Sequence, residues 1–374
     1  MADKSYKFLL DLRQKPGNNA CADCGESDPE WTSWNLGVFL CEGCAGVHRS
    51  LGAHISKVKS IRLDKWEEDQ LRLMESEGNI KCQEKYEQQV PPSYRRPCST
   101  DVQVLKEQWI RAKYERLEFT NPEKQTYLSG RKEGYMWKRG KDNNKFQSRR
   151  FVLSETENTL KYYNKEDAKT PKATLKIDQI NVTFVPDKIG NLNGLQITYD
   201  NEGSTRNLFL YTEEGKDIVD WYNAIRSAKL NILRVAFPGT DDEELISNLT
   251  RDFLKEGWLY KTGPNKGDAF KKRWFTLDNR KLMYYPDPLD PFPKGEVFLG
   301  YKNKGNAVRE GVPPGFKTQG YPFTIKTPER NFVLSAEYED EQSQWMEILK
   351  FVIEKPLTPQ DSSTGGWTAG LHSK

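Results

Sequence analysis

Four cysteines near the start of the chain have the type and spacing of metal ligands. Cys21 and Cys24 form one Cys-x-x-Cys pair, Cys41 and Cys44 form a second, and sixteen residues separate the two pairs. Each pair makes a tight turn that aims two thiolates at one point, so two such turns can surround one tetrahedral ion. The spacing therefore predicts one structural zinc ion per chain, with every coordination position filled by protein.

Other readings of these cysteines are two disulfides, an iron–sulfur cluster or four reduced thiols in a core. The remaining cysteines, Cys82 and Cys98, have no ligand spacing, and we expect them to be free thiols. This cysteine usage is typical of a reducing compartment. Since four thiolates leave no position for water, any chemistry at a zinc site here must come from a neighbouring side chain.

Arg49 is the neighbour best suited to chemistry, because it follows Cys44 by five positions. A guanidinium is permanently charged, planar and able to bridge two phosphate oxygens. Inserted into the nucleotide site of a partner, such a group stabilises charge on the phosphoryl oxygens and accelerates hydrolysis by roughly 10³–10⁵-fold. The alternative is a structural arginine that pairs with an acid such as Asp64.

Histidines and tryptophans also lie near the cysteines. His48 and His54 are the only histidines in this region. Because the cysteines complete the zinc shell, we expect both histidines to have structural or partner-contacting roles. Trp31 and Trp34 are candidates for contact with a partner, although we expect at least one of them to lie in the core beneath the zinc.

The region 21–64 resembles the Arf GTPase-activating (ArfGAP) domain. The resemblance rests on the cysteine frame, on Trp31, and on the segments NLGVF at 35–39, GVHRSLG at 46–52 and SKVKS at 56–60. In that family the arginine at the position of Arg49 is catalytic. The resemblance implies that a GTP-bound Arf-family GTPase is the partner and carries the nucleotide and magnesium. The chain would supply an arginine finger in trans and have no hydrolytic site of its own.

Length and composition favour several globular domains. The chain has 374 residues, 30% of them charged and 12% aromatic, and its net charge is only +3. No global field argues for nucleic acid, acids stand among the bases near the cysteines, and no basic recognition helix follows them. No apolar run has the length of a transmembrane segment, and the first fifteen residues lack the features of a secretory signal.

Before residue 131 the pattern outside the cysteine region is helical. Apolar spacing predicts helices over 4–15, 65–89 and 102–119, the second broken at Gly78-Asn79. A linker is expected over 121–131.

From Glu133 onward the pattern changes to short alternating strands and then repeats. The segment EGYMWK at 133–138 recurs as EGWLYK at 256–261, and RRFVL at 149–153 recurs as RWFTL at 273–277. In the first copy, strands are predicted over 134–137, 150–153, 159–163, 173–177, 194–199 and 206–211. Each copy closes with one amphipathic helix, which carries Trp221 or Trp345. The pattern predicts two small antiparallel β barrels or sandwiches, each closed by a helix.

Both copies resemble pleckstrin-homology (PH) domains, and the whole arrangement resembles the centaurin-alpha family of ArfGAPs with dual PH domains. The resemblance rests on Glu-Gly-x-x-x-Lys in the first strand, a basic second strand with Arg-x-Phe-x-Leu, and the helical tryptophan. It implies a multidomain α+β fold with a zinc-containing ArfGAP domain followed by two PH domains. The implied boundaries are 1–126, 131–234 and 253–356, with a flexible tail at 357–374.

PH domains that bind inositol phosphates gather basic residues and a tyrosine around one loop, and the resemblance places such a pocket in each copy. The matching residues in the first copy are Lys138, Arg149, Tyr162 and Lys172, with Gln147 in place of a basic residue. Those in the second copy are Lys261, Lys271, Arg273, Tyr284 and Lys294. Loop cations that could compensate for Gln147 are Arg139, Lys141 and Lys145. Fixed cations of this kind bind a multiply charged headgroup through charge-assisted hydrogen bonds.

The resemblance implies a GTPase-activating protein for Arf-family GTPases. Phosphoinositides, with phosphatidylinositol 3,4,5-trisphosphate as the implied headgroup, would recruit it from the cytoplasm to the plasma membrane, and the resemblance also allows a nuclear pool. The alternative is a non-catalytic, phosphoinositide-dependent adaptor whose zinc module binds proteins. On the residues alone, either PH domain could instead be a protein-interaction module.

Overall fold

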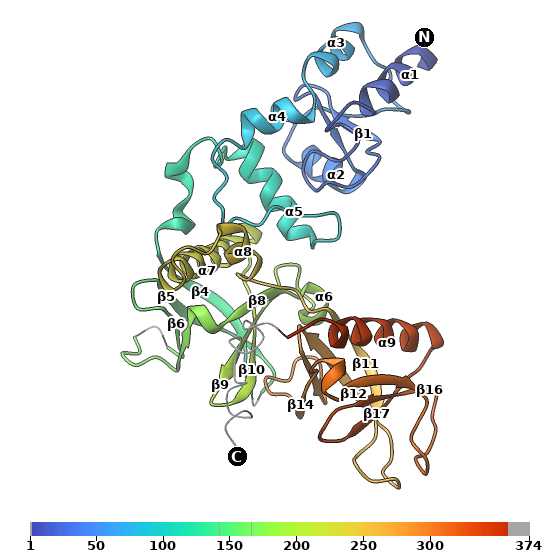
Figure 1. The fold of residues 1–374 in the computed structure, drawn as a ribbon. Coiled ribbons are helices and arrows are strands. Elements are labelled where there is room, and N and C mark those ends of the chain that lie inside the picture. Colours follow the sequence, from blue (N-terminus) through green and yellow to red (C-terminus); the bar gives the residue numbers. More distant parts are fainter. Residues whose placement is uncertain (1, 142, 166, 358–374) are drawn as a thin grey trace. The chain divides into compact units, whose positions relative to one another are not determined.

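The computed structural model describes residues 2–141, 143–165 and 167–357. Figure 1 traces the chain as a ribbon. Its described residues form two compact units. The first unit comprises residues 1–134, 151–161 and 212–249, and the second comprises 135–150, 162–211 and the described residues from 250 onward. The predicted tail, apart from Leu357, lies outside the described residues.

The cysteine region is built on a small antiparallel sheet. Its strands are β1 (Trp31–Ser33), β2 (Val38–Leu40) and β3 (Val58–Ser60), in the order β2-β1-β3. Gly37, with φ +71°, makes the turn between β1 and β2, where a Cβ would lie 2.3 Å from Cβ of Glu77. Helix α2 (Glu42–Ser50) begins directly after Cys41, whose sulfur accepts a hydrogen bond from the Cys44 N–H.

Helices surround this sheet: α1 (Ala2–Arg13), α3 (Glu68–Ser76), α4 (Asn79–Tyr86) and α5 (Gln103–Ile110). The predicted break at Gly78-Asn79 is confirmed, because α3 ends and α4 begins there. The helix predicted over 102–119 is shorter than expected. Helix α5 gives way to a π-helical turn, η1 (Arg111–Glu115), and Leu117 adopts φ +55°, which an α-helix does not accommodate.

The expected linker over 121–131 contains two short 3₁₀ helices, η2 (Pro122–Lys124) and η3 (Thr126–Leu128). The Tyr127 ring packs against Tyr94 with the ring centres 5.4 Å apart, and Tyr127 is buried. This segment is therefore anchored to the buried cluster that contains the four cysteines. The sequence analysis missed it because aromatic contacts between distant residues leave no local periodicity.

The two repeats have the same sheet topology. The first contains β4 (Arg131–Arg139), β5 (Phe146–Ser154), β6 (Thr159–Tyr163), β7 (Ala173–Lys176), β8 (Asn181–Phe184), β9 (Leu195–Asn201) and β10 (Ser204–Tyr211). The second contains β11 (Lys255–Lys261), β12 (Lys271–Asp278), β13 (Lys281–Tyr285), β14 (Gly295–Phe298), β15 (Ala307–Glu310), β16 (Tyr321–Lys326) and β17 (Asn331–Ala336). The strand orders, β7-β6-β5-β4-β10-β9-β8 and β14-β13-β12-β11-β17-β16-β15, are equivalent. Strand β8 was not predicted.

The predicted closing helices are α7 (Gly215–Ala236) and α9 (Glu339–Glu354). Each buries its tryptophan against a phenylalanine of the second strand, with ring centres 6.3 Å apart for Trp221 and Phe151 and 6.4 Å apart for Trp345 and Phe275. In Figure 1, α9 lies against the strands of its own repeat. The same contact in both copies supports the internal duplication.

Helix α7 has two further partners within the first unit. Its Ala224 lies in the same buried cluster as Trp109 and Phe119, and its Arg226 Nε donates a 2.7 Å hydrogen bond to the Ser93 carbonyl. At its end, Leu230 packs with Leu245 of α8 (Asp242–Ser247). The closing helix of the first repeat therefore shares a hydrophobic core with the zinc module.

Small helical turns complete the second unit: η4 (Ile177–Gln179), α6 (Pro186–Ile189) and η5 (Lys302–Lys304).

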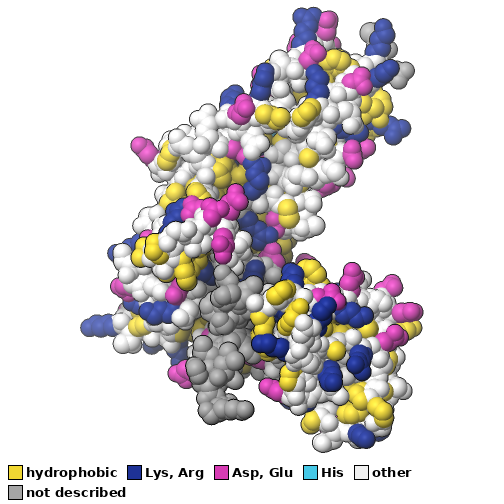
Figure 2. Space-filling view, viewed as in Figure 1, with side chains coloured by type: hydrophobic (Ala, Val, Ile, Leu, Met, Phe, Trp, Pro, Cys, Tyr) yellow, Lys and Arg dark blue, Asp and Glu magenta, His cyan; other side chains and the backbone are white. Residues whose placement is uncertain are grey.

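Basic and acidic side chains are interspersed over the face drawn in Figure 2. Within the described part of the chain, no helix combines the length and the apolar character needed to cross a membrane.

Candidate functional site

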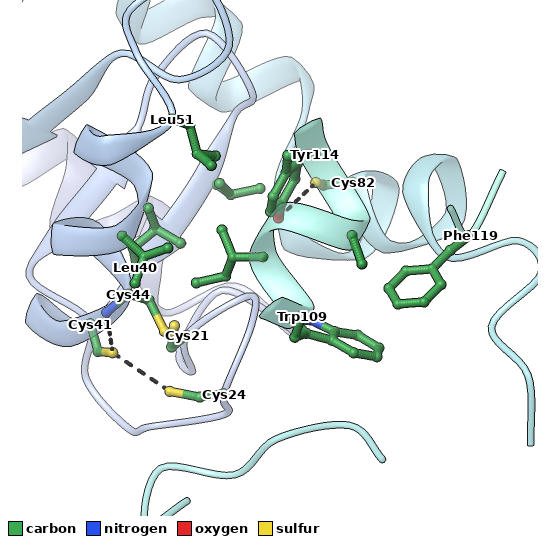
Figure 3. Close-up of a cluster of buried hydrophobic side chains, with 14 of the residues drawn as sticks. Cys21, Cys24, Leu40, Cys41, Cys44, Leu51, Cys82, Trp109, Tyr114 and Phe119 are labelled. Atoms are coloured by element: carbon green, nitrogen blue, oxygen red, sulfur yellow. Dashed lines mark hydrogen bonds between the residues drawn. The ribbon is translucent and has the colours of Figure 1, made fainter. Parts of the chain in front are cut away.

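The four metal-spaced cysteines converge. All four are buried, and their sulfur atoms lie within 4.8 Å of one another (Figure 3). The Sγ atoms of Cys24 and Cys41 are 3.5 Å apart, close to the separation of about 3.8 Å that Zn–S bonds of about 2.3 Å impose in a tetrahedron. None of the four is disulfide-bonded, so the disulfide alternative is wrong. A closed set of four thiols fits a structural metal.

Arg49 lies in the last turn of α2 and is exposed to solvent. Its guanidinium carbon is 4.3 Å from the centre of the Trp31 ring, within the range of a cation–π contact. Asp64 instead accepts a 2.6 Å hydrogen bond from the Ser60 N–H, and no acid among the described residues pairs with Arg49. The structural-arginine alternative therefore has no support in this geometry.

Trp31 and Trp34 are both half-buried, and each packs against a different core. Trp31 packs against the cysteine cluster, and Trp34 packs against the cluster that contains Leu9 and Phe39. Trp31 therefore contacts both Arg49 and the buried cluster that contains the cysteines.

His48, one residue before Arg49, is fully buried and hydrogen-bonded through both ring nitrogens. Nε2 lies 2.9 Å from Asp23 Oδ2, and Nδ1 lies 2.9 Å from Ser56 Oγ. These contacts tie α2 to the first cysteine turn and to the segment before β3. The structural role expected for His48 is confirmed, whereas His54 is exposed.

Lys113 completes this buried group. Its Nζ lies 3.1 Å from Asp23 Oδ1 and 2.7 Å from Glu87 Oε1, and its side chain is fully buried. Burial acts to raise the pKa of Asp23, but the charges and hydrogen bonds of Lys113 and His48 outweigh it and hold that pKa below its ordinary value. The sequence analysis missed Lys113, because no local pattern connects it to a carboxylate ninety residues earlier.

In the first repeat, the predicted pocket residues come together within the second unit. The Lys138 Nζ lies 5.1 Å from the centre of the Tyr162 ring, and the Lys172 N–H donates a 2.8 Å hydrogen bond to the Tyr162 carbonyl. Arg149 donates to the side chain of Gln147 and to the Ser148 carbonyl. Gln147 therefore orients the arginine instead of adding a charge.

Burial lowers the pKa of Lys138 to about 8, and repulsion by Arg206, Arg149 and Lys172 adds to the effect. The smaller, repulsive part of the shift comes from three cations that lie near Lys138. A pocket of this kind favours a multiply charged anion.

The second repeat reproduces these contacts. The Lys261 Nζ lies 4.9 Å from the centre of the Tyr284 ring, and the Lys294 N–H donates a 2.8 Å hydrogen bond to the Tyr284 carbonyl. Burial, followed by repulsion from Arg330 and Arg273, lowers the pKa of Lys261 to about 8. Lys271 is exposed and stands opposite Lys261 in the sheet.

The sequence analysis overlooked one cation in each pocket, Arg206 in the first and Arg330 in the second. Both belong to an Arg-Asn pair at the start of the last strand, at 206–207 and at 330–331. The internal repeat would have revealed them, because the two pairs align when the copies are superposed on their tryptophans. Each arginine is close enough to the first-strand lysine of its repeat to lower the pKa of that lysine.

Comparison with known families covers most of the chain. Residues 6–123 match the ArfGap family model, described as "GTPase activating protein for Arf", and residues 130–230 and 253–354 match the PH domain model. Arf-GAP with dual PH domain-containing protein 2 of Homo sapiens is 48% identical over 378 residues, which cover 100% of this chain and 99% of that protein.

Other relatives share all or part of this arrangement. The Rattus norvegicus protein of the same name is 50% identical over 363 residues, covering 96% of each chain. Stromal membrane-associated protein 1 of Mus musculus is 46% identical over 112 residues, which cover 30% of this chain and 25% of that protein. The chain therefore belongs to the family of Arf-GAP proteins with dual PH domains.

Proposed function

We propose that this protein activates GTP hydrolysis by Arf-family GTPases and reaches membranes by binding phosphoinositides through its two PH domains. The observation that carries the activating role is the state of Arg49. It is exposed, it stacks on Trp31, and among the described residues it has no acidic partner. An arginine that is held in place but not neutralised is suited to enter the nucleotide site of a partner.

The zinc module would hold that arginine in a fixed position. We assign Cys21, Cys24, Cys41 and Cys44 as the ligands of one zinc ion per chain. When bound, zinc supplies a structural cross-link and no reactive position, because four thiolates close its shell. The chain's own residues contribute positioning. The His48–Asp23 hydrogen bond fixes α2 to the first cysteine turn, and the Trp31 ring supports the Arg49 guanidinium. The nucleotide and its magnesium belong to the Arf partner.

The lipid role rests on the two crowded cation pockets. We assign Lys138, Arg149, Tyr162 and Lys172 to the first and Lys261, Lys271, Arg273, Tyr284 and Lys294 to the second, with phosphatidylinositol 3,4,5-trisphosphate as the preferred lipid. Two attachment points on one membrane give avidity beyond either affinity. The proposed domains are 1–126, 131–234 and 253–356, and the protein would move from the cytoplasm to the plasma membrane when the lipid is produced.

The test is single-turnover GTP hydrolysis by lipid-anchored, GTP-loaded Arf on vesicles with and without the trisphosphate. Arg49→Lys keeps the charge but loses the planar fork, so it should lower the activated rate by about 10³-fold or more while vesicle binding is unchanged. Arg62→Lys, at another exposed arginine of the same module, is the matched control. Near-normal activation by Arg49→Lys would favour a phosphoinositide-dependent adaptor instead.

A further inference from the structure

The loop that joins β13 to β14 in the second PH domain touches the pocket of the first PH domain. This loop, residues 286–293, has the sequence PDPLDPFP. Arg139 Nη1 donates a 2.9 Å hydrogen bond to the Leu289 carbonyl, and the Asn207 N–H donates a 2.8 Å hydrogen bond to the Pro291 carbonyl. All of these residues belong to the second compact unit.

Phe292 of the same loop contacts two cations of the first domain. The Lys141 Nζ is 5.2 Å from the centre of its ring, and the Arg206 guanidinium carbon is 5.4 Å from it. Both distances fall within the range of a cation–π contact. Arg206 is the pocket arginine that lowers the pKa of Lys138, and Arg139 follows Lys138 in β4. Phe292 therefore touches the cations of the first pocket, although it belongs to the other domain.

The loop is built to hold its shape. Four of its eight residues are prolines, whose backbone φ angles are fixed. The Leu289 N–H donates a 2.9 Å hydrogen bond to Asp287 Oδ1, and the Asp290 N–H donates a 3.1 Å hydrogen bond to the Asp287 carbonyl. A preorganised loop loses little conformational entropy when it supports a binding site.

Hydrogen bonds at both ends of the loop anchor it to the first domain. Before the loop, the Tyr285 hydroxyl accepts a 3.0 Å hydrogen bond from Asn207 Nδ2. After it, Glu296 Oε1 accepts a 2.8 Å hydrogen bond from the Thr205 N–H. Asn207 and Thr205 flank Arg206 on β10, so the pocket arginine is held from both sides by the second domain.

We propose that the 286–293 loop forms a wall of the first headgroup pocket, in which Phe292 positions Lys141 and Arg206 against a polyphosphorylated inositol. The first pocket is then a composite of both PH domains and reaches full affinity only with this loop in place. The aromatic face offsets the mutual repulsion of the crowded cations without neutralising them, which an acid in the same place would do. This inference rests on the proposed lipid-binding function.

The experiment uses the full chain and soluble inositol 1,3,4,5-tetrakisphosphate as the probe, titrated by calorimetry. Arg273→Ala disables the second pocket, so the heat of binding that remains comes from the first pocket. In that background Phe292→Ala should weaken binding by about 3- to 10-fold, the loss expected for two cation–π contacts. Phe292→Trp should preserve the affinity, because it keeps the aromatic face, whereas Phe292→Leu should behave like Phe292→Ala.

Two controls separate positioning from a general loss of structure. Tyr338→Ala removes an exposed aromatic of the second domain outside the loop and should leave the first pocket unchanged. In an Arg149→Ala background, which reports the second pocket, Phe292→Ala should also have no effect. Unchanged or tighter binding at the first pocket, or equal weakening at both pockets, would overturn the composite pocket alone. Absence of any binding to the Arg273→Ala chain would overturn the first pocket's lipid role and this inference with it.

Discussion

The guanidinium carbon of Arg49 lies 4.3 Å from the centre of the Trp31 ring, and the two residues come from different elements, α2 and β1. The stack restrains a long, flexible side chain that has no acidic partner among the described residues. It also leaves the guanidinium free to exchange an aromatic face for phosphate oxygens. The contact therefore links the rigidity of the cysteine module to the proposed reaction.

Replacing Trp31 tests this link. Trp31→Ala should lower the maximal rate at which this protein stimulates GTP hydrolysis by Arf by about 10-fold or more, because Arg49 then samples many unproductive orientations. Trp31→Phe should retain more activity, since a smaller aromatic face remains. Single-turnover kinetics and a thermal melt of each variant provide the check. A Trp31→Ala protein that is folded and fully active would contradict the positioning role.

Metal removal should unfold more than the cysteine region. Structural zinc sites contribute about 10–16 kcal/mol of apparent binding free energy, so Cys24→Ala or chelation should unfold the first module. Because Ala224 of α7 shares its core, hydrogen exchange should also speed up in that helix. Helix α9 should keep its protection. Elemental analysis of the native chain should give one zinc, and folded protein without metal would contradict the assignment.

Lys113→Met should destabilise the zinc module strongly. It leaves Asp23 and Glu87 buried without their shared cation, and breaking a buried ion pair costs about 3–5 kcal/mol. Thermal unfolding of the zinc-loaded chain is the measurement. Lys124→Met, at an exposed lysine of the same region, should change the melting temperature little. Equal effects of the two substitutions would show that the buried group is not a stabilising unit.

Headgroup binding should weaken as pH rises through about 8. The pKa values of Lys138 and Lys261 are lowered from 10.5 to about 8, and an anionic ligand favours the protonated lysines. Binding is therefore coupled to proton uptake above pH 8. In that range the affinity should fall by up to about 10-fold per pH unit for each lysine. Below pH 7 both lysines are already protonated, so their titration should leave the affinity nearly unchanged. Calorimetry with the soluble tetrakisphosphate from pH 6.5 to 9.5 measures it. Lys138→Met in the Arg273→Ala chain should flatten the profile, and an unchanged slope would contradict the assignment.

On membranes, the two pockets should act together. Arg149→Ala and Arg273→Ala should each weaken sedimentation with trisphosphate-containing vesicles. The double variant should lose far more than either single one, because the first attachment makes the second intramolecular. Vesicles with phosphatidylserine but no phosphoinositide are the control. If the double variant binds as well as one single variant, only one pocket engages the membrane.

Much of this protein could be predicted from local sequence patterns. The zinc frame lies within twenty-four residues, Cys21 to Cys44, and tight Cys-x-x-Cys turns follow from short-range geometry. The strands of the two repeats and their closing helices follow from apolar periodicity and duplication. Lys138 and Lys261 were singled out by the repeated first-strand motif together with its resemblance to PH domains, and each lies near the end of the first strand of its repeat.

Other features exist only because distant segments pack together. Lys113 forms a hydrogen bond with Asp23, and Phe292 makes a cation–π contact with Arg206. In both pairs the residues are too far apart in the sequence for any local pattern to connect them. The anchoring of 121–131 and the shared core of α7 likewise depend on side-chain packing between elements. The sequence alone determined the convergence of the four cysteines and the two repeats, since these depend on short turns and on strand periodicity. The tertiary structure decided which charged side chains are buried in ion pairs, as Lys113 is, and which are exposed to solvent, as Arg49 is. Burial depends on packing between segments that are distant in the sequence.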